Sequence, residues 1–159
     1  MATRGSRETT MAKDSTSRPK RCFETSLDIR VGTYEIDYAG HVSNQVYLRW
    51  CEDLRLQLLE EHFPLEGLMA DGFMPVLISS EVRYHKPIKL FDKPTGYMWL
   101  EKLGPATMEF CGEFKVGEML ATSVKHTGVF VNTTTMKPTR MPEKIVTKFK
   151  EWQGNDDRN

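Results

Sequence analysis

One long segment of the sequence, residues 45–63, contains neither glycine nor proline. Its apolar residues recur at intervals of three and four, the spacing that places side chains on one face of a helix: Tyr47, Trp50, Leu54 and Leu58. Ser43 and Asn44, just before the segment, are favoured at helix N-termini, and Pro64, just after it, cannot continue a helix. The sequence therefore predicts a single long helix.

Segments on both sides of this helix have the pattern of β-strands. Residues 23–31 alternate between apolar and polar side chains, as in a strand with one buried face. Four more strand-like segments follow the helix and are separated by glycine and proline turns: residues 76–85, 95–103, 106–116 and 118–132. Strands so closely spaced favour an antiparallel sheet over alternating βαβ units. The sequence predicts an α+β fold of five antiparallel strands and one long helix, with a short terminal helix over residues 142–152.

Charge is distributed unevenly along the 159 residues. Residues 1–21 carry six basic and two acidic side chains and almost nothing apolar, a composition that predicts a disordered basic tail. The other residues hold 16 basic and 20 acidic side chains, a net charge of −4, which argues against a nucleic-acid partner. We expect one domain, residues 22–153, flanked by this tail and by a disordered C-terminus at residues 154–159.

The three cysteines, Cys22, Cys51 and Cys111, form no CxxC pair and are odd in number. This pattern argues against a disulfide framework and against a zinc site, and we expect no metal or cofactor. No apolar run approaches the roughly 20 residues that span a bilayer, and the N-terminus lacks the apolar core of a secretory signal. We expect a cytoplasmic protein with no membrane partner.

A lone carboxylate, Asp37, lies between the first predicted strand and the start of the helix. A carboxylate can attack a carbonyl carbon or take a proton, and the unpaired N–H groups of a helix's first turn can stabilise a developing negative charge. Gly40 allows the loop to turn tightly or to approach a ligand closely. Thioesters lack strong resonance stabilisation, so one base or nucleophile and one oxyanion site could suffice for their hydrolysis.

The run around Asp37 has a recognisable form: Asp37-x-x-Gly40-His41-Val42-x-Asn44-x-x-Tyr47, followed by Leu48-Arg49-Trp50. It resembles the signature of the hotdog-fold acyl thioesterases of the 4-hydroxybenzoyl-CoA thioesterase type. Residues 82–87, 100–104 and 137–142 are also similar to segments of that family, and the resemblance covers about residues 23–150. It implies a hotdog fold, in which a five-stranded antiparallel sheet wraps one long central helix.

The resemblance also implies roles for individual residues. Asp37 would act on the thioester carbonyl as a general base or as a nucleophile, two roles that the sequence leaves open. The backbone N–H at Asn44 would polarise the carbonyl oxygen. Gly40, His41 and Tyr47 would lie against the substrate, although His41 could instead hold the loop and Tyr47 could pack in the core.

The same resemblance implies an acyl-CoA or acyl-carrier-protein thioester as substrate. Family members pair edge to edge, so we expect a homodimer or homotetramer in which Ser79 or Ser80 of a partner strand completes the site.

Two other functions are compatible with the fold. His62-Phe63-Pro64 is similar to a motif of hotdog dehydratases, but it follows the predicted helix, whereas in those enzymes the motif precedes it. A hydro-lyase acting on acyl thioesters is therefore the weaker alternative. A non-catalytic acyl-binding protein is the other, because a fold does not guarantee an activity. Asp37 is also the type of residue that caps loops without any catalytic role.

Overall fold

The computed structural model describes residues 19–157. Most of the predicted N-terminal tail, residues 1–18, lies outside the described residues, as do residues 158 and 159. The disorder predicted for these residues therefore stays a prediction.

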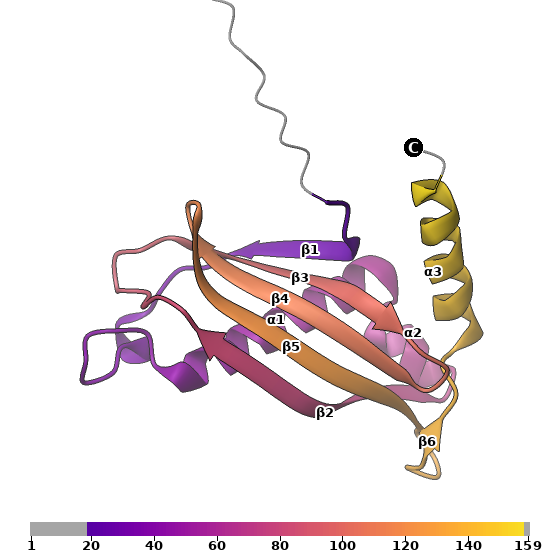
Figure 1. The fold of residues 1–159 in the computed structure, drawn as a ribbon. Helices are drawn as coiled ribbons and strands as arrows, with labels where there is room; N and C mark the ends of the chain where they lie inside the picture. The colour runs from indigo at the N-terminus through magenta and orange to yellow at the C-terminus, as the bar shows by residue number, and fades with distance from the viewer. Residues whose placement is uncertain (1–18, 158–159) are drawn as a thin grey trace, which may run out of the picture.

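An antiparallel sheet forms one layer of the molecule (Figure 1). Five strands lie side by side in the order β1-β3-β4-β5-β2, and a short sixth strand pairs with β5. Their bounds are β1 (Cys22–Asp28), β2 (Phe73–Tyr84), β3 (Pro94–Leu103), β4 (Thr107–Val116), β5 (Met119–Asn132) and β6 (Pro138–Thr139). The predicted α+β class is confirmed, and the sheet has six strands where five were predicted. The extra strand arises because a tight turn after β5 folds residues 138 and 139 back onto Phe130 and Val131.

The helix α1 (Asn44–His62) crosses one face of this sheet, behind it in Figure 1. Its apolar stripe, including Trp50 and Leu54, is buried against Met98 of β3 and Phe114 of β4. At Gly96 a Cβ atom would lie 2.9 Å from both Leu54 Cδ1 and Phe114 Cε1, so the glycine permits this close approach. Burying a leucine or a larger side chain in this way contributes about 1.5–3 kcal/mol each. The long helix predicted over residues 45–63 is thus confirmed to within one residue.

Two further helices close one end of the molecule. The helix α2 (Leu65–Ala70) buries Leu68, and the helix α3 (Glu143–Asp156) buries Ile145, in a second apolar cluster that also holds Phe63 and Leu100. From the sequence, Gly67 and Gly72 indicate a linker here, so this helix is not predicted. The terminal helix extends to Asp156, four residues past its predicted end, so residues 154–156 are helical where disorder was predicted.

Candidate active site

The segment ahead of α1 is a closed loop. A short 3-10 helix, η1 (Thr33–Glu35), leads into it, and an antiparallel bridge between Ile36 and Val42 closes its base. Within the loop, the Asp37 N–H donates to the His41 carbonyl at 2.8 Å and the Gly40 N–H donates to the Asp37 carbonyl at 3.0 Å. Gly40 has φ +76°, a conformation that costs a side chain-bearing residue about 1–2 kcal/mol. The loop therefore holds the Asp37 backbone in one place.

The carboxylate of Asp37 is oriented by its own loop. Its Oδ1 accepts a hydrogen bond from the Ala39 N–H at 2.9 Å and a longer one from the His41 N–H at 3.4 Å. Within residues 19–157 the other oxygen, Oδ2, has no hydrogen-bond partner. One oxygen thus caps the loop, as the structural interpretation of Asp37 expects, while the second remains available to a water or a carbonyl carbon.

The start of α1 supplies free N–H groups next to this carboxylate. Ser43 is the N-cap residue, and its own N–H donates to the Glu35 carbonyl at 2.8 Å. The Val46 N–H donates to the Ser43 carbonyl at 3.0 Å, whereas those of Asn44 and Gln45 find no acceptor in the described part of the chain. Neither Ser43 nor Asn44 caps the helix through its side chain, contrary to the expectation for these residue types. Unpaired N–H groups and the helix dipole together favour negative charge here.

A cavity of about 240 Å³ joins these groups. Asp37, His41, Asn44 and Tyr47 all line it, so the structure brings four of the five predicted site residues together. The fifth, Gly40, shapes the loop from outside the lining. Tyr47 has only 2% of its surface exposed and packs edge-on against Trp50 and Phe114, so most of its ring belongs to the core.

Tyr84, the last residue of β2, is a site residue that sequence reasoning did not single out. Its hydroxyl donates to the Asn44 carbonyl at 2.9 Å, and its ring meets Tyr47 at 5.3 Å between centroids. Burial raises the pKa of Tyr84, so the hydroxyl stays protonated and remains a donor at neutral pH. His85 and Lys86 continue the cavity wall beyond it. The one sequence signal was the position of Tyr84 within residues 82–87, which resemble a family segment.

An ion pair between a buried carboxylate and a half-exposed arginine ties the loop to the helix. Glu35, with 4% of its surface exposed, accepts a hydrogen bond from the Gly32 N–H at 2.8 Å and pairs with Arg49 on α1. Because Arg49 lies one turn and a half into the helix, the pair fixes the loop relative to the first-turn N–H groups. Nothing in the local sequence pattern indicated this contact.

The described residues also lack two features. None of the helices within residues 19–157 is both long and apolar enough to cross a membrane. In the same residues no group of three or more His, Cys, Asp or Glu side chains gathers as a metal site.

The sequence was compared with known protein families. The sequence profile described as the thioesterase-like superfamily matches residues 31–149, most of the chain. The chain belongs to the thioesterase-like superfamily. This membership confirms the predicted enzyme class, a thioester hydrolase.

Solved structures agree with the family at the level of fold. A DHNA-CoA thioesterase from Staphylococcus aureus matches with a TM-score of 0.75 and 20% identity over 85% of this chain and 94% of its own. A 1,4-dihydroxy-2-naphthoyl-CoA thioesterase from Synechocystis matches with a TM-score of 0.69 and 16% identity, over 79% of this chain and 94% of its own. A hypothetical protein from Aquifex aeolicus matches with a TM-score of 0.71 and 23% identity, over 78% of this chain and 98% of its own. These likenesses support a hotdog-like fold for this member of the superfamily. Among curated proteins, no sequence matches the chain significantly.

Proposed function

We propose that this thioesterase-like protein hydrolyses an acyl-CoA or acyl-carrier-protein thioester to a free acid and a thiol, as enzymes of the 4-hydroxybenzoyl-CoA thioesterase type do. The observation that carries the proposal is the shared cavity at the start of α1, which Asp37 and Asn44 both line. The cavity combines a carboxylate that has a free oxygen with a helix start that has free N–H groups.

The proposed chemistry needs only these two groups. The thioester oxygen would accept a hydrogen bond from the Asn44 N–H, which stabilises the negative charge that develops as the carbonyl carbon becomes tetrahedral. Asp37 would either take a proton from an attacking water or attack the carbon itself to give an anhydride that water then opens. In both routes the carbon–sulfur bond breaks and the thiol leaves. Gly40, His41 and Tyr47 would shape the surroundings of the reacting carbonyl.

A panel of acyl-CoA and acyl-carrier-protein thioesters, assayed by thiol release, tests the proposal. Asp37→Asn should lower kcat/KM by about 10²–10⁴-fold, the usual contribution of general acid–base catalysis. Asp53→Asn is the matched control, because Asp53 is exposed on α1, outside the cavity, and makes no polar contact in the described structure. Full activity in Asp37→Asn would refute the assignment.

Isotope labelling separates the two routes. In a single turnover in ¹⁸O-water, a general base leaves the Asp37 carboxylate unlabelled, since solvent oxygen enters only the product. A nucleophile that forms an anhydride can carry the label into the carboxylate itself. An unlabelled Asp37 peptide in mass spectrometry would count against the nucleophile.

The proposed enzyme is an oligomer in which two copies of the chain pair through β2. β2 is an edge strand, and it exposes Leu77 and Ile78, with 58% of the Ile78 surface accessible. An unpaired strand edge with apolar residues favours pairing with another strand, so we expect a homodimer, or a homotetramer built from it, with Ser79 or Ser80 near the join. A cytoplasmic location fits its three free cysteines.

The hydro-lyase alternative gains no support from the geometry. His62 is the last residue of α1, and a helix of 19 residues separates it from the Asp37 end by about 28 Å. Its ring packs against Phe23 at 4.9 Å, in the second apolar cluster. A non-catalytic acyl-binding protein would show no thiol release in the same panel.

A further inference from the structure

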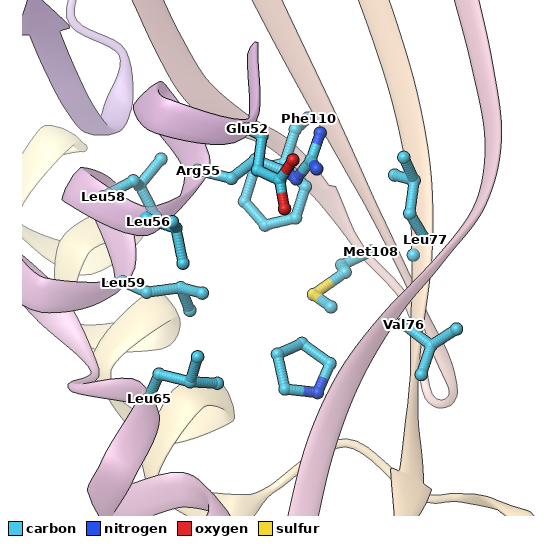
Figure 2. A pocket seen from close by; sticks show the side chains of 12 residues that line it. Glu52, Arg55, Leu56, Leu58, Leu59, Leu65, Val76, Leu77, Met108 and Phe110 are labelled. Carbon is cyan, nitrogen blue, oxygen red and sulfur yellow. The ribbon is translucent and has the colours of Figure 1, made fainter. Parts of the chain in front are cut away.

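A second cavity lies between α1, α2 and β2, and we name it the α1–β2 cleft (Figure 2). Its volume is about 230 Å³, comparable to roughly eight water molecules at about 30 Å³ each. Leucines from the two helices face Val76 and Met108 across the gap. Two lining side chains carry a charge, Glu52 and Arg55, and Figure 2 places both at the same end of the cleft.

No carboxylate of residues 19–157 forms an ion pair with Arg55, although Glu52 lies close enough to raise its pKa. Its Nη1 lies 3.0 Å from Nδ1 of His126, and within residues 19–157 Arg55 forms no ion pair. Burial lowers the pKa of Arg55, and the neighbouring Cys51 and Glu52 offset this only in part. A guanidinium has five N–H donors in a fixed fork, so several remain available to a ligand.

His126 holds this cation in place. The ring lies on β5 and is completely buried. Because a guanidinium only donates hydrogen bonds, Nδ1 must accept, and the proton of the neutral ring is then on Nε2. Burial and the charge of Arg55 lower the pKa of His126 to about 4, so the ring is neutral at physiological pH. The pair therefore carries one full positive charge beside an apolar cleft.

We propose that Arg55, held by His126, recognises an anion in the α1–β2 cleft, and that this anion is the terminal carboxylate of the acyl group. A half-buried cation that forms no ion pair is costly, and a carboxylate can satisfy the guanidinium fork with two parallel hydrogen bonds. The apolar walls suit the methylene chain between the carboxylate and the thioester. The inference rests on the proposed function and names its substrate class: the thioester of a dicarboxylic acid.

Pairing of β2 with the β2 of a second copy would allow one ligand to reach both sites. Within one chain, Tyr84 at the first cavity and Leu77 at the cleft are seven residues apart along β2, or about 23 Å at 3.3 Å per residue. This span exceeds the length of a six-carbon acyl chain. If two β2 strands pair antiparallel about a point between Ser79 and Ser80, Tyr84 of one copy lies opposite Pro75 of the other. The catalytic end of one copy would then adjoin the cleft of its partner.

Binding of two non-hydrolysable thioethers tests the inference independently of catalysis. S-(5-carboxypentyl)-CoA and S-hexyl-CoA have chains of six carbons and differ by the terminal carboxylate. Calorimetry on the wild-type protein should show at least tenfold tighter binding of the carboxylated ligand, as expected for a charge-assisted bidentate contact. Thiol release from the two corresponding thioesters, adipoyl-CoA and hexanoyl-CoA, is measured in parallel.

Three variants assign this preference to the cleft. Arg55→Met keeps the volume of the side chain but removes the charge, and the ratio of the two dissociation constants should fall to about one. Arg55→Lys keeps the charge without the fork and should give an intermediate ratio. Arg30→Met is the matched control, since Arg30 is exposed and follows β1, the opposite edge strand of the sheet, and it should leave the ratio unchanged.

The other results count against the inference or against the proposed function on which it rests. Equal affinity of the two thioethers for the wild type, or a preference that survives in both Arg55 variants, overturns it. If Arg55→Met changes the mass of the oligomer but not the ratio of the two dissociation constants, Arg55 forms an ion pair with the second copy instead. A preserved binding preference without thiol release from either thioester would reject the proposed function alone. Binding of neither thioether would reject both.

Discussion

The hydroxyl of Tyr84 holds the first-turn peptide of α1, and its removal should affect catalysis more than folding. Tyr84→Phe loses the 2.9 Å hydrogen bond to the Asn44 carbonyl but keeps the ring that packs on Tyr47. We expect kcat for a thioester substrate to fall about three- to tenfold, the worth of one hydrogen bond. Tyr34→Phe is the control, because Tyr34 is 83% exposed and its hydroxyl bonds to nothing in the described structure. Equal effects of the two changes would remove Tyr84 from the site.

The buried imidazole of His126 should make stability depend on pH. The unfolded chain takes up this proton near pH 6.5, whereas the folded protein takes it up only near pH 4. Between these values the unfolded state binds more protons, so stability is present above pH 6.5 and is lost as the pH falls towards 4. From pH 7 to pH 5 this single group should cost about 2 kcal/mol of unfolding free energy.

Urea unfolding of wild type and His126→Asn at pH 7 and pH 5 measures that contribution. The asparagine Oδ1 can take the place of Nδ1 as the acceptor for Arg55 but does not titrate. The loss of stability on acidification should be smaller in the variant by about 2 kcal/mol. The pKa of His62 is also lowered, by burial and by Lys148, but His62 is present in both proteins and its contribution cancels. An identical pH dependence in both proteins would contradict the assignment.

At the scale of elements, the loop between η1 and α1 should depend on the positive φ of Gly40. Gly40→Ala adds a Cβ that meets no atom within 4 Å, so its cost of about 1–2 kcal/mol comes from the backbone alone. We expect the loop to shift, which misplaces Asp37 and lowers kcat/KM at least tenfold. Gly117→Ala, in the turn between β4 and β5, has φ +58° and the same open surroundings. It should lower the melting temperature similarly while leaving kcat/KM unchanged, and a loss of activity in both would mean that general instability is the cause.

At the scale of the whole molecule, the unpaired edge of β2 is partly apolar, and its proposed pairing can be tested by charge. Ile78→Lys places an ammonium in the exposed centre of β2, where two copies would bring two such charges together. Analytical ultracentrifugation should show a shift from dimer or tetramer towards monomer, with loss of activity. Phe91→Lys replaces another exposed apolar residue, 90% accessible, in the loop before β3, and should not change the mass. An unchanged assembly in Ile78→Lys would place the interface elsewhere.

Local patterns predicted the helix and the main strands because each depends on residues close together in the chain. The helix bounds and the strands β3 to β5 were placed to within about one residue, since glycine and proline turns mark their ends. The helix α2 was missed because Gly67 in its interior and Gly72 just after it resemble a linker. The strand β6 was missed because a two-residue strand exists only through its pairing with β5.

The sequence by itself determined the α+β class, the long helix, and a carboxylate next to a helix start, and its resemblance to thioesterases is confirmed at the level of the superfamily. Only the tertiary structure placed Tyr84 on the Asn44 carbonyl, 40 residues away, and Arg55 on His126, 71 residues away. Periodicity reports which face of an element is buried, but not which residue of a distant element it meets. Such contacts depend on strand register and on the angle at which α1 crosses the sheet, and neither is encoded in a local pattern.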